Sequence, residues 1–367
     1  MRIAISDSRR GWGGATTVAA ELARGLAERG HHIVVLCRPD SPIVRALRGA
    51  AAVEAVLRSA KTPPRSIVNA TLALRRHGIE AVISSIARDR RISMPAARLA
   101  GAVAVARWPA ARPVGTGFQG WVDRLALHYV ANSRATERVL LGSAPWLDTD
   151  RVSVVPNGVD ADRFARAAPA PLGLPAGAMA FGYVGRMDDE KGLPELAEAW
   201  RTVARRLPSA HLVLVGGGPA EAIRARLAGE PRVQFLGYRT DVAEILRALD
   251  LLVVPSRTEA FGIAAAEAMA AGRPVVATAV DGLPELVRDG IDGVLVPALA
   301  PAALAEAMVA LGSDPARRAA LGEAGARRIR ERFGRAAMVD GYEVLLERLI
   351  AEARASRARR RGRLASG

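Results

Sequence analysis

Short apolar runs alternate with longer amphipathic segments along the whole chain. Val18, Leu22 and Leu26 recur every fourth residue, which predicts a helix with one buried face over residues 15–29. Gly30 is placed to end that helix. The apolar runs are too short for helices and predict buried strands. These runs are Ile3–Ile5, Ile33–Leu36, Ala81–Ser84, Ala102–Ala106, Val130–Ala131 and Val152–Val155 in the first half, and Phe181–Val184, Leu212–Val215, Val233–Leu236, Leu251–Val254, Val275–Ala277 and Val294–Val296 in the second.

Both halves of the chain repeat this rhythm of strand and helix. The apolar runs are rich in Val, Ile and Leu on both strand faces. Such runs, separated by helices, are typical of parallel sheets that are covered on both sides. We therefore predict an α/β protein with two Rossmann-like, doubly wound domains. Its ligand would bind at the carboxyl ends of the strands, in the cleft between the domains.

A linker separates the two expected domains. Residues 165–178 contain three prolines and two glycines, a composition typical of a connecting segment. We place the N-terminal domain at residues 1–165 and the second at 166–335. Two helices are expected after Asp314, ending near Phe333 and Arg354. The last part, residues 336–367, combines the second of these helices with an arginine-rich tail that we expect to be disordered.

The composition excludes several classes of protein. The chain has 367 residues, of which 50% are apolar and 24% charged, which is too apolar for a disordered chain and too charged for a membrane bundle. Its single cysteine, Cys37, excludes an intrachain disulfide and predicts a reducing compartment. No uncharged apolar run reaches about 18 residues, so no membrane-spanning helix is expected. The apolar run after Met1 is too short for the core of a signal peptide.

The net charge of +15 is distributed unevenly. Residues 1–170 contain 25 basic and 13 acidic side chains, whereas residues 171–350 contain 21 and 23. This imbalance predicts an anionic partner for the first half, and nucleic acid, an acidic membrane surface or an anionic substrate would each serve. Fifty of the basic residues are arginines, so the two lysines, Lys61 and Lys191, stand out.

Two glycine-rich loops each follow a predicted strand and precede a predicted helix. One contains Gly13 and Gly14, and the other contains Gly216 and Gly217. Glycine lets a backbone approach a ligand closely, and a helix N-terminus attracts an anion. The first loop lacks the spacing of the dinucleotide-binding fingerprint. The alternative for both loops is a tight turn with no ligand.

A third loop carries two basic side chains directly after the predicted strand Phe181–Val184. Arg186 and Lys191 lie five residues apart, next to Gly185. Arginine and lysine at the carboxyl end of a strand form a fork that suits a diphosphate. The alternative is a solvated charge cluster, and the rarity of lysine in this chain argues against it.

Two glutamates separated by seven residues follow the predicted strand Leu251–Val254. Glu259 lies in a loop. Glu267 lies in the next helix among apolar neighbours, where an acid requires a polar partner such as a sugar hydroxyl. The backbone N–H groups at the start of this helix would face a phosphate or sugar oxygen, and they belong to Phe261, Gly262 and Ile263. Helix capping explains Glu259 but leaves Glu267 unexplained.

Taken in order, these elements resemble glycosyltransferase family 4, a retaining family of the two-domain GT-B class. The E-x7-E element runs from Glu259 to Glu267, and the G-R-x-x-x-x-K-G element runs from Gly185 to Gly192. The resemblance covers nearly the whole chain. It is also carried by Ala131-Asn132-Ser133, Pro156-Asn157-Gly158-Val159-Asp160 and Asp281-Gly282-Leu283-Pro284-Glu285.

The resemblance implies a role for each motif. Arg186 and Lys191 would bind the donor diphosphate and stabilise the leaving group. Glu259, with the N–H groups that follow it, would bind the donor hexose, and Glu267 would hold the ribose. The remaining donor-binding residues implied by the resemblance are Gly13, Gly14, Gly185, Gly216, Gly217, Tyr238 and Arg239, the last two lining the base pocket.

One departure from the family concerns the acceptor side. The family often has a histidine after the strand predicted here at Ala102–Ala106, where this chain has Arg107. Arg107 is a candidate replacement, and Arg88 and Asn132 are further candidates for acceptor binding. For Arg88 and its neighbours, Arg90 and Arg91, the alternative is a solvated face.

We expect neither a metal nor a cofactor, because the resemblance gives the basic pair the role that a metal has on the leaving diphosphate. Two D-x-D patterns, at residues 148–150 and 160–162, match metal-dependent glycosyltransferases. Neither follows a strand end that would hold a metal and a diphosphate. Asp160 is instead expected to cap a helix.

The predicted function is the transfer of a hexosyl group from a nucleotide sugar, a UDP-sugar rather than a GDP-sugar, to a saccharide or lipid-linked acceptor. Polysaccharide or lipopolysaccharide synthesis for the cell envelope is the expected setting. The charge predicts a cytoplasmic protein attached peripherally to the inner face of the cell membrane. One alternative is a nucleotide-sugar 2-epimerase on the same fold. Another is a basic nucleic-acid-binding protein, although no nucleic-acid-binding pattern is present.

Overall fold

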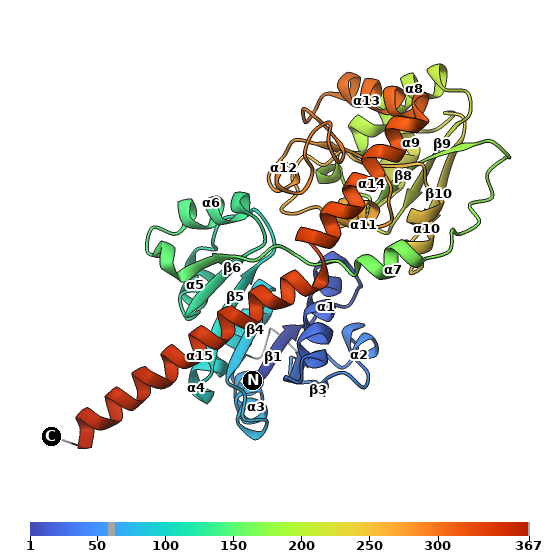
Figure 1. The fold of residues 1–367 in the computed structure, drawn as a ribbon. Helices are drawn as coiled ribbons and strands as arrows, with labels where there is room; N and C mark the ends of the chain where they lie inside the picture. Colours follow the sequence, from blue (N-terminus) through green and yellow to red (C-terminus); the bar gives the residue numbers. More distant parts are fainter. Residues whose placement is uncertain (58–62, 366–367) are drawn as a thin grey trace. The chain divides into compact units, whose positions relative to one another are not determined.

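The computed structural model describes residues 1–57 and 63–365, so Lys61 lies outside the described residues. The chain forms two compact units (Figure 1). The first unit contains residues 1–158 and 335–367, and the second contains residues 159–334.

The first unit is built on a seven-stranded parallel sheet in the order β3-β2-β1-β4-β5-β6-β7. Its strands are β1 Arg2–Asp7, β2 His32–Cys37, β3 Ala52–Glu54, β4 Ala81–Ser84, β5 Val103–Trp108, β6 His128–Ala131 and β7 Val152–Val154. Its α-helices are α1 Gly14–Glu28, α2 Ile43–Ala46, α3 Pro63–Arg76, α4 Ala87–Ala100, α5 Gly117–Asp123, α6 Arg134–Ser143 and α15 Arg335–Ala365, with a 3-10 turn, η1, at Thr149–Arg151.

The second unit repeats this plan with a six-stranded parallel sheet in the order β10-β9-β8-β11-β12-β13. Its strands are β8 Met179–Val184, β9 Ala210–Val215, β10 Val233–Gly237, β11 Leu251–Val254, β12 Val275–Thr278 and β13 Val294–Val296. Its α-helices are α7 Ala161–Arg166, α8 Leu193–Arg206, α9 Glu221–Arg226, α10 Val242–Ala248, α11 Ile263–Ala270, α12 Leu283–Leu286, α13 Pro301–Ser313 and α14 Pro315–Arg332, with a 3-10 turn, η2, at Asp189–Lys191.

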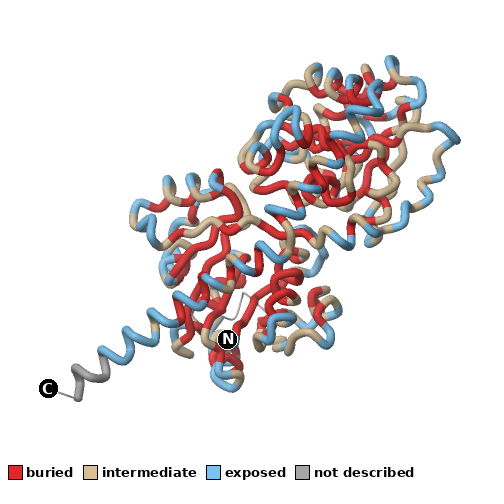
Figure 2. Tube along the Cα trace, in the orientation of Figure 1, coloured by how far each residue is buried: buried red, intermediate tan, exposed pale blue. Residues whose placement is uncertain are grey.

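These two sheets confirm the predicted fold of two Rossmann-like domains. In each sheet the strand order reverses at the first strand, β1 or β8, which has its successor on one side and a later strand on the other. Ligands of doubly wound sheets bind at the carboxyl edge beside such a reversal. The central strands are buried (Figure 2), as their continuous apolar runs require. Cys37 is buried in β2.

The division into units differs from the expected boundary at residue 165. It falls between Gly158 and Val159, because α7 packs against α10 and α11 of the second unit. The last helix, α15, returns to the first unit, where it contacts α1 and β5. The expectation of a disordered tail from Arg357 was wrong, since α15 continues to Ala365. Alanine and arginine, which dominate this stretch, both favour helix.

None of the helices in the described ranges is long and apolar enough to cross a membrane.

Candidate functional site

Two loops of the second unit meet at the carboxyl edge of its sheet. One follows β8 and carries Gly185 to Gly192, and the other follows β11 and carries Pro255 to Gly262. Because β8 and β11 are neighbours in the sheet, the loops leave it side by side. The strand order reverses at this point. The sheet thus brings the G-R-x-x-x-x-K-G element and the first glutamate of the E-x7-E element together.

An ion pair links these two loops. Lys191 Nζ lies 2.6 Å from Glu259 Oε2, and both side chains are largely buried, with 22% and 19% of their surface exposed. The Ser256 hydroxyl also donates to this carboxylate oxygen, at 3.4 Å. One of the two lysines in the sequence thus lies against the first glutamate of the E-x7-E element. The pair offers a cation and hydrogen-bonding oxygens within one small volume.

Arg186 is much more exposed, at 68% of its side chain. Its guanidinium lies 3.0 Å from Asp188 and 3.8 Å from Glu190. The Tyr183 hydroxyl fixes the backbone at Arg186 by donating to the Arg186 carbonyl oxygen at 2.5 Å. Burial raises the pKa of Tyr183, so this hydroxyl stays protonated as a donor. The arginine is therefore anchored at its backbone and open to solvent at its guanidinium.

Glycines allow the loops to pack closely. Gly192 has φ +69°, and a Cβ there would lie 1.7 Å from the Pro255 carbonyl oxygen. Gly216 has φ +146°, and a Cβ there would lie 1.7 Å from the Gly185 carbonyl oxygen. Gly217 accepts a hydrogen bond from Met187 N–H at 2.9 Å. Only glycine suits positions with both positive φ and such close contact.

Helix α11 begins directly after the Glu259 loop. Gly262 has φ +94° at its start, and Glu267 lies in the middle of the helix, half-buried. The first N–H groups of a helix have no partner within it, so those near Ile263 face the carboxyl edge. The Phe261 side chain points elsewhere. It is buried against Phe333, with ring centroids 5.7 Å apart.

Tyr238 and Arg239 follow β10 at the same edge of the sheet. The Tyr238 side chain is exposed and lies beside Gly217. Arg239 pairs with Asp241, with Nε 2.7 Å from Oδ1. An exposed aromatic ring beside a glycine loop can stack on a flat ligand.

In the first unit, the predicted Gly13–Gly14 motif forms the start of α1. Gly13 is the N-cap of the helix, and a Cβ there would meet nothing within 4 Å. Beside it, Arg9 pairs with Asp7 at 2.8 Å and reaches Thr16 at 3.3 Å. Burial lowers the pKa of Arg9. The first turn of α1, which begins at this uncrowded glycine, is therefore contacted by a basic side chain.

The candidate acceptor residues differ in accessibility. Arg88 is partly exposed and donates to the Ser8 hydroxyl at 2.7 Å. Arg107 is buried and donates to Asn157 at 2.5 Å. Asn132 is buried, and its amide donates to the Pro109 carbonyl and accepts from the Thr136 hydroxyl. Because Thr136 lies in α6, Asn132 helps to hold the start of that helix.

Arg90, from the same predicted basic cluster as Arg88, is buried. Its Nε lies 2.8 Å from Asp123, and its guanidinium stacks 4.3 Å from the centre of the Trp108 ring. Neither a solvated face nor acceptor binding fits this position.

The structure places three further polar residues, Ser8, Asp89 and Asp281, at the carboxyl edges. None of them was given a role in the sequence analysis. Asp89 is buried and accepts from the Ser8 N–H at 2.8 Å. Burial raises the pKa of Asp89 to about 6. In the second unit, Asp281 accepts from the Glu259 N–H at 2.8 Å. Asp281 lies in a family motif, which was the only signal available for it.

The two D-x-D patterns lie at a 3-10 turn and at the start of a helix. The first contributes to η1, and Asp160 of the second caps α7 by accepting from Arg163 N–H at 3.1 Å. This confirms the predicted cap. Within residues 1–57 and 63–365, no three His, Cys, Asp or Glu side chains are grouped as a metal site would need.

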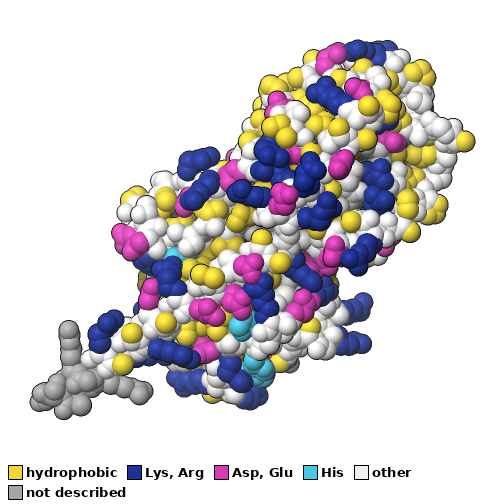
Figure 3. All heavy atoms as spheres, viewed as in Figure 1, with side chains coloured by type: hydrophobic (Ala, Val, Ile, Leu, Met, Phe, Trp, Pro, Cys, Tyr) yellow, Lys and Arg dark blue, Asp and Glu magenta, His cyan; other side chains and the backbone are white. Residues whose placement is uncertain are grey.

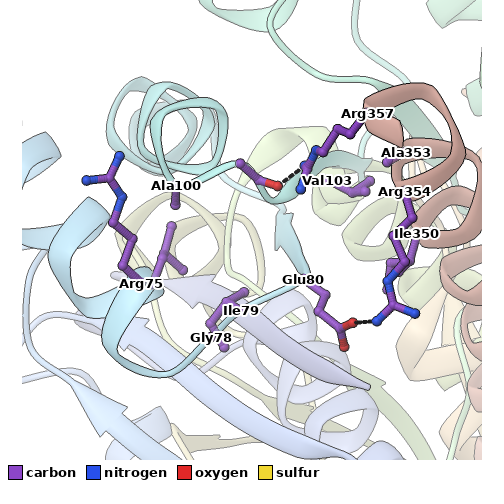
Figure 4. A pocket seen from close by; sticks show the side chains of 12 residues that line it. Arg75, Gly78, Ile79, Glu80, Ala100, Val103, Ile350, Ala353, Arg354 and Arg357 are labelled. Carbon is purple, nitrogen blue, oxygen red and sulfur yellow. Dashed lines mark hydrogen bonds and ion pairs between the residues drawn. The ribbon is translucent and has the colours of Figure 1, made fainter. Parts of the chain in front are cut away.

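A cavity of about 300 Å³ lies at the opposite, amino end of the first sheet, against α15 (Figure 4). Its arginines serve the fold. Arg75 donates to the Leu99 carbonyl, Arg357 to the Gly101 carbonyl, and Arg354 pairs with Glu80. The first two bonds satisfy carbonyl groups at the end of α4, so the cavity offers no better site than the carboxyl edges.

Comparison with known families gives two matches. The family described as "Glycosyl transferases group 1" matches residues 178–314, and "Glycosyltransferase Family 4" matches residues 12–163.

Curated relatives match over part of their length. A D-inositol 3-phosphate glycosyltransferase of Xylanimonas cellulosilytica is 37% identical over 223 residues, which is 53% of this chain and 52% of that protein. A protein of the same name from Mycobacterium tuberculosis is 43% identical over 164 residues, 41% of this chain and 33% of that protein. The chain thus spans about half the length, or less, of the curated relatives it matches.

Solved structures are similar over nearly the whole chain. Anabaena HepE, in complex with UDP and glucose, has a TM-score of 0.81 at 21% identity and covers 95% of this chain and 99% of its own. A glycosyltransferase of Rickettsia africae has a TM-score of 0.83 at 19% identity, with 95% and 98% covered. Sucrose-phosphate synthase of Thermosynechococcus elongatus has a TM-score of 0.80 at 24% identity, with 96% and 99% covered. At these identities the likeness shows the fold.

Proposed function

Because the chain belongs to glycosyltransferase family 4, with the two domains of the GT-B fold, we propose that it transfers a hexosyl group from a nucleoside-diphosphate sugar to a saccharide or lipid-linked acceptor, with retention at the anomeric carbon. One observation carries the proposal. Lys191 and Glu259, from two loops, meet at 2.6 Å at the carboxyl edge, beside the start of α11.

On this proposal the second unit holds the donor. Arg186 and Lys191 bind the diphosphate, and their charge stabilises the leaving group without a metal. Glu267 binds the ribose, and Glu259 binds hydroxyls of the hexose. The glycine loops give the phosphates room, and the exposed Tyr238 ring stacks on the base.

A UDP-sugar is the proposed donor. The supporting observation is that HepE, with the same fold, is described in complexes with UDP and with UDP-glucose. The acceptor hydroxyl attacks the anomeric carbon on the face from which the leaving group departs. A phosphate oxygen of the leaving group takes up the proton of this hydroxyl.

The first unit binds the acceptor in this proposal. Arg9 and Arg88 lie at the carboxyl ends of β1 and β4, next to the open start of α1. Two guanidinium groups at one edge favour an acceptor that carries a phosphate or another anionic group. The curated relatives are named for an acceptor of this kind, inositol 3-phosphate. A place in cell-envelope polysaccharide or lipopolysaccharide synthesis agrees with such an acceptor.

Peripheral attachment to an anionic membrane face is part of the proposal. On the face seen in Figure 3, basic side chains lie among acidic ones, so net charge alone defines no docking surface there. Helix α5 supplies a more specific feature. Its Phe118 and Trp121 are exposed by 58% and 57%, with ring centroids 5.9 Å apart. Its only acid, Asp123, is buried against Arg90. Exposed aromatic rings on a helix that exposes no acid of its own suit a membrane interface.

Sedimentation with vesicles tests the attachment. We expect binding to phosphatidylcholine vesicles that contain phosphatidylglycerol, and loss of binding in a Phe118→Ser/Trp121→Ser variant. Ile291→Ser, at an equally exposed apolar residue of the second unit, is the matched control. Equal binding by the double variant would remove α5 from the proposal.

Thermal unfolding with UDP, GDP or ADP, without added metal, tests the donor site. A ligand at about 100 times its Kd stabilises the native state by about 2.7 kcal/mol, which shifts the melting temperature visibly. We expect UDP to give the largest shift and Lys191→Ala and Glu267→Ala to abolish it. If no nucleotide shifts the transition, the proposed donor site is wrong.

A further inference from the structure

The loop that carries Glu259 is held by a segment on its far side from Lys191. This segment, residues 278–283, runs from the end of β12 into α12. Its contacts begin at Thr278, whose hydroxyl donates to the Ser256 carbonyl at 2.5 Å. They end at Leu283, which packs so closely on Gly262 that a Cβ at Gly262 would lie 2.6 Å from its side chain. Both ends of the Glu259 loop are thus fixed by the same six residues.

The central contacts of this segment fall on Glu259 itself. The Glu259 N–H donates to Asp281 Oδ2 at 2.8 Å, and the Glu259 carbonyl accepts from the Gly282 N–H at 3.0 Å. Both backbone polar groups of Glu259 are therefore bonded to two consecutive residues. Its side chain remains directed at Lys191, 2.6 Å away.

Asp281 makes this contact from an unusual backbone conformation. Its φ is +43°, and in the part of the chain that the structure describes only Arg232 and Leu299 are other non-glycine residues with positive φ. Such conformations persist where the surroundings enforce them, and they are common at functional sites. The next residue is packed tightly, since a Cβ at Gly282 would lie 2.1 Å from the Ala260 carbonyl oxygen. This packing holds the backbone at Asp281 in its conformation. Aspartate tolerates positive φ better than most residues.

We propose that Asp281 is a positioning residue that fixes the backbone of Glu259, so that the Glu259 carboxylate is set toward Lys191 and the donor sugar. This inference rests on the proposed function for its catalytic consequence. Asp281 itself acts through a backbone hydrogen bond and needs no contact with the substrate. A misplacement of about 1 Å in a reacting group can cost up to 100-fold in rate, so loss of this bond should lower kcat.

Three variants separate the hydrogen bond from the backbone conformation. Asp281→Gly removes the acceptor and relieves the positive φ, so we expect kcat to fall by about 10- to 100-fold while the UDP affinity and the melting temperature are kept. Asp281→Asn keeps an oxygen acceptor and tolerates the same φ, and it should retain most of the activity. Asp281→Ala removes the acceptor and tolerates the positive φ poorly, so both stability and kcat should fall. Leu299→Gly relieves a φ of +57° at a residue that makes none of these contacts with the Glu259 loop, and it should leave kcat unchanged.

A second readout does not depend on activity. Hydrogen–deuterium exchange of the peptide that covers residues 255–262 should become faster in Asp281→Gly and stay slow in Asp281→Asn. Unchanged exchange in Asp281→Gly would overturn the positioning role, whatever the enzyme transfers. Equal loss of kcat in Asp281→Asn and Asp281→Gly would also overturn it, because the carboxylate charge would then matter rather than the bond. If the exchange behaves as expected but the wild type binds no nucleotide, the proposed function fails and the structural contact stands.

Discussion

Lys191 Nζ and Glu259 Oε2 lie 2.6 Å apart, although the two residues follow different strands and are 68 positions apart in the sequence. In this pair each group balances the charge of the other. A diphosphate carries more negative charge than one carboxylate and would compete for the ammonium group. Donor binding should therefore draw Lys191 to the phosphates and leave Glu259 available for sugar hydroxyls.

This competition predicts opposite effects of two substitutions on UDP binding. Lys191→Ala removes the cation and should weaken UDP binding strongly, with a loss in kcat of about 10² to 10³. Glu259→Gln removes the competitor, so UDP should bind as well as before or more tightly, whereas transfer slows. Titration calorimetry and initial rates measure the two quantities.

The control for these variants is Arg201→Ala, which breaks an exposed ion pair with Glu230 in the same unit. Exposed pairs contribute about 0–1 kcal/mol to stability, so neither UDP binding nor transfer should change. Weaker UDP binding in Glu259→Gln, to the same degree as in Lys191→Ala, would contradict the competition.

Gly192 and Gly229 offer a matched test of loop packing. Both have positive φ, +69° and +78°, but a Cβ at Gly192 would lie 1.7 Å from the Pro255 carbonyl, whereas one at Gly229 meets nothing within 4 Å. Gly229→Ala should cost about 1 kcal/mol of backbone strain. Gly192→Ala should cost clearly more, because the two loops must separate, and it should also weaken UDP binding. Urea unfolding measures the difference, and equal costs would mean that the loops are not packed as described.

Buried Asp89 predicts a distinctive pH dependence of stability. Burial raises its pKa from 3.8 to about 6 in the folded state. Between pH 3.8 and about 6, Asp89 is protonated in the folded protein and ionised in the unfolded chain. The contribution of Asp89 to stability therefore decreases as the pH rises through this range, and it is constant above about 6. The difference between the two pKa values corresponds to about 3 kcal/mol.

Asp89→Asn should remove that decrease. His128, whose pKa burial lowers to about 4, acts in the opposite direction, since the unfolded state binds more protons between pH 4 and 6.5. Urea unfolding from pH 4 to 7 should therefore show the stability of Asp89→Asn rising more steeply with pH than that of the wild type. Parallel curves would show that Asp89 titrates normally.

Transfer should not require a divalent cation. On the proposed function, Arg186 and Lys191 would supply the positive charge that a metal would otherwise bring to the leaving diphosphate. We expect the same initial rate after dialysis against EDTA as with added Mg²⁺ or Mn²⁺. A rate that disappears in EDTA and returns with Mn²⁺ would assign the leaving-group role to a metal.

Most of the fold could be predicted from the sequence because its strands are continuous apolar runs. Every strand in the described ranges except β3 was predicted. β3 is short, lies at the sheet edge and exposes Val53, so it lacks the run of Val, Ile and Leu that marks the other strands. The helical end of α15 was missed because charge density suggested disorder, whereas local propensity favours helix.

The candidate site was less accessible to sequence reasoning. Motif spacing located Lys191 and Glu259 in loops after two predicted strands, but the adjacency of these strands and the contact between the residues depend on the sheet order. The same limit applies to Arg107 and Asn132. The family resemblance suggested acceptor binding for both, but the structure buries them in internal hydrogen bonds. The role of Asp281 arises from a backbone bond between distant loops, which no pattern reveals.

The chain passes between the units twice, at Gly158–Val159 and at Gly334–Arg335, and Val159 forms a bridge with Gly334. This connection bears on synthesis by the ribosome. The second unit is one continuous segment and can complete its fold as soon as residue 334 has emerged. The first unit, although made first, must wait for α15, whose Val339 packs against Gly25 of α1. Until then the apolar surface that α15 covers stays open, and nascent chains that stall before it are the ones most exposed to aggregation.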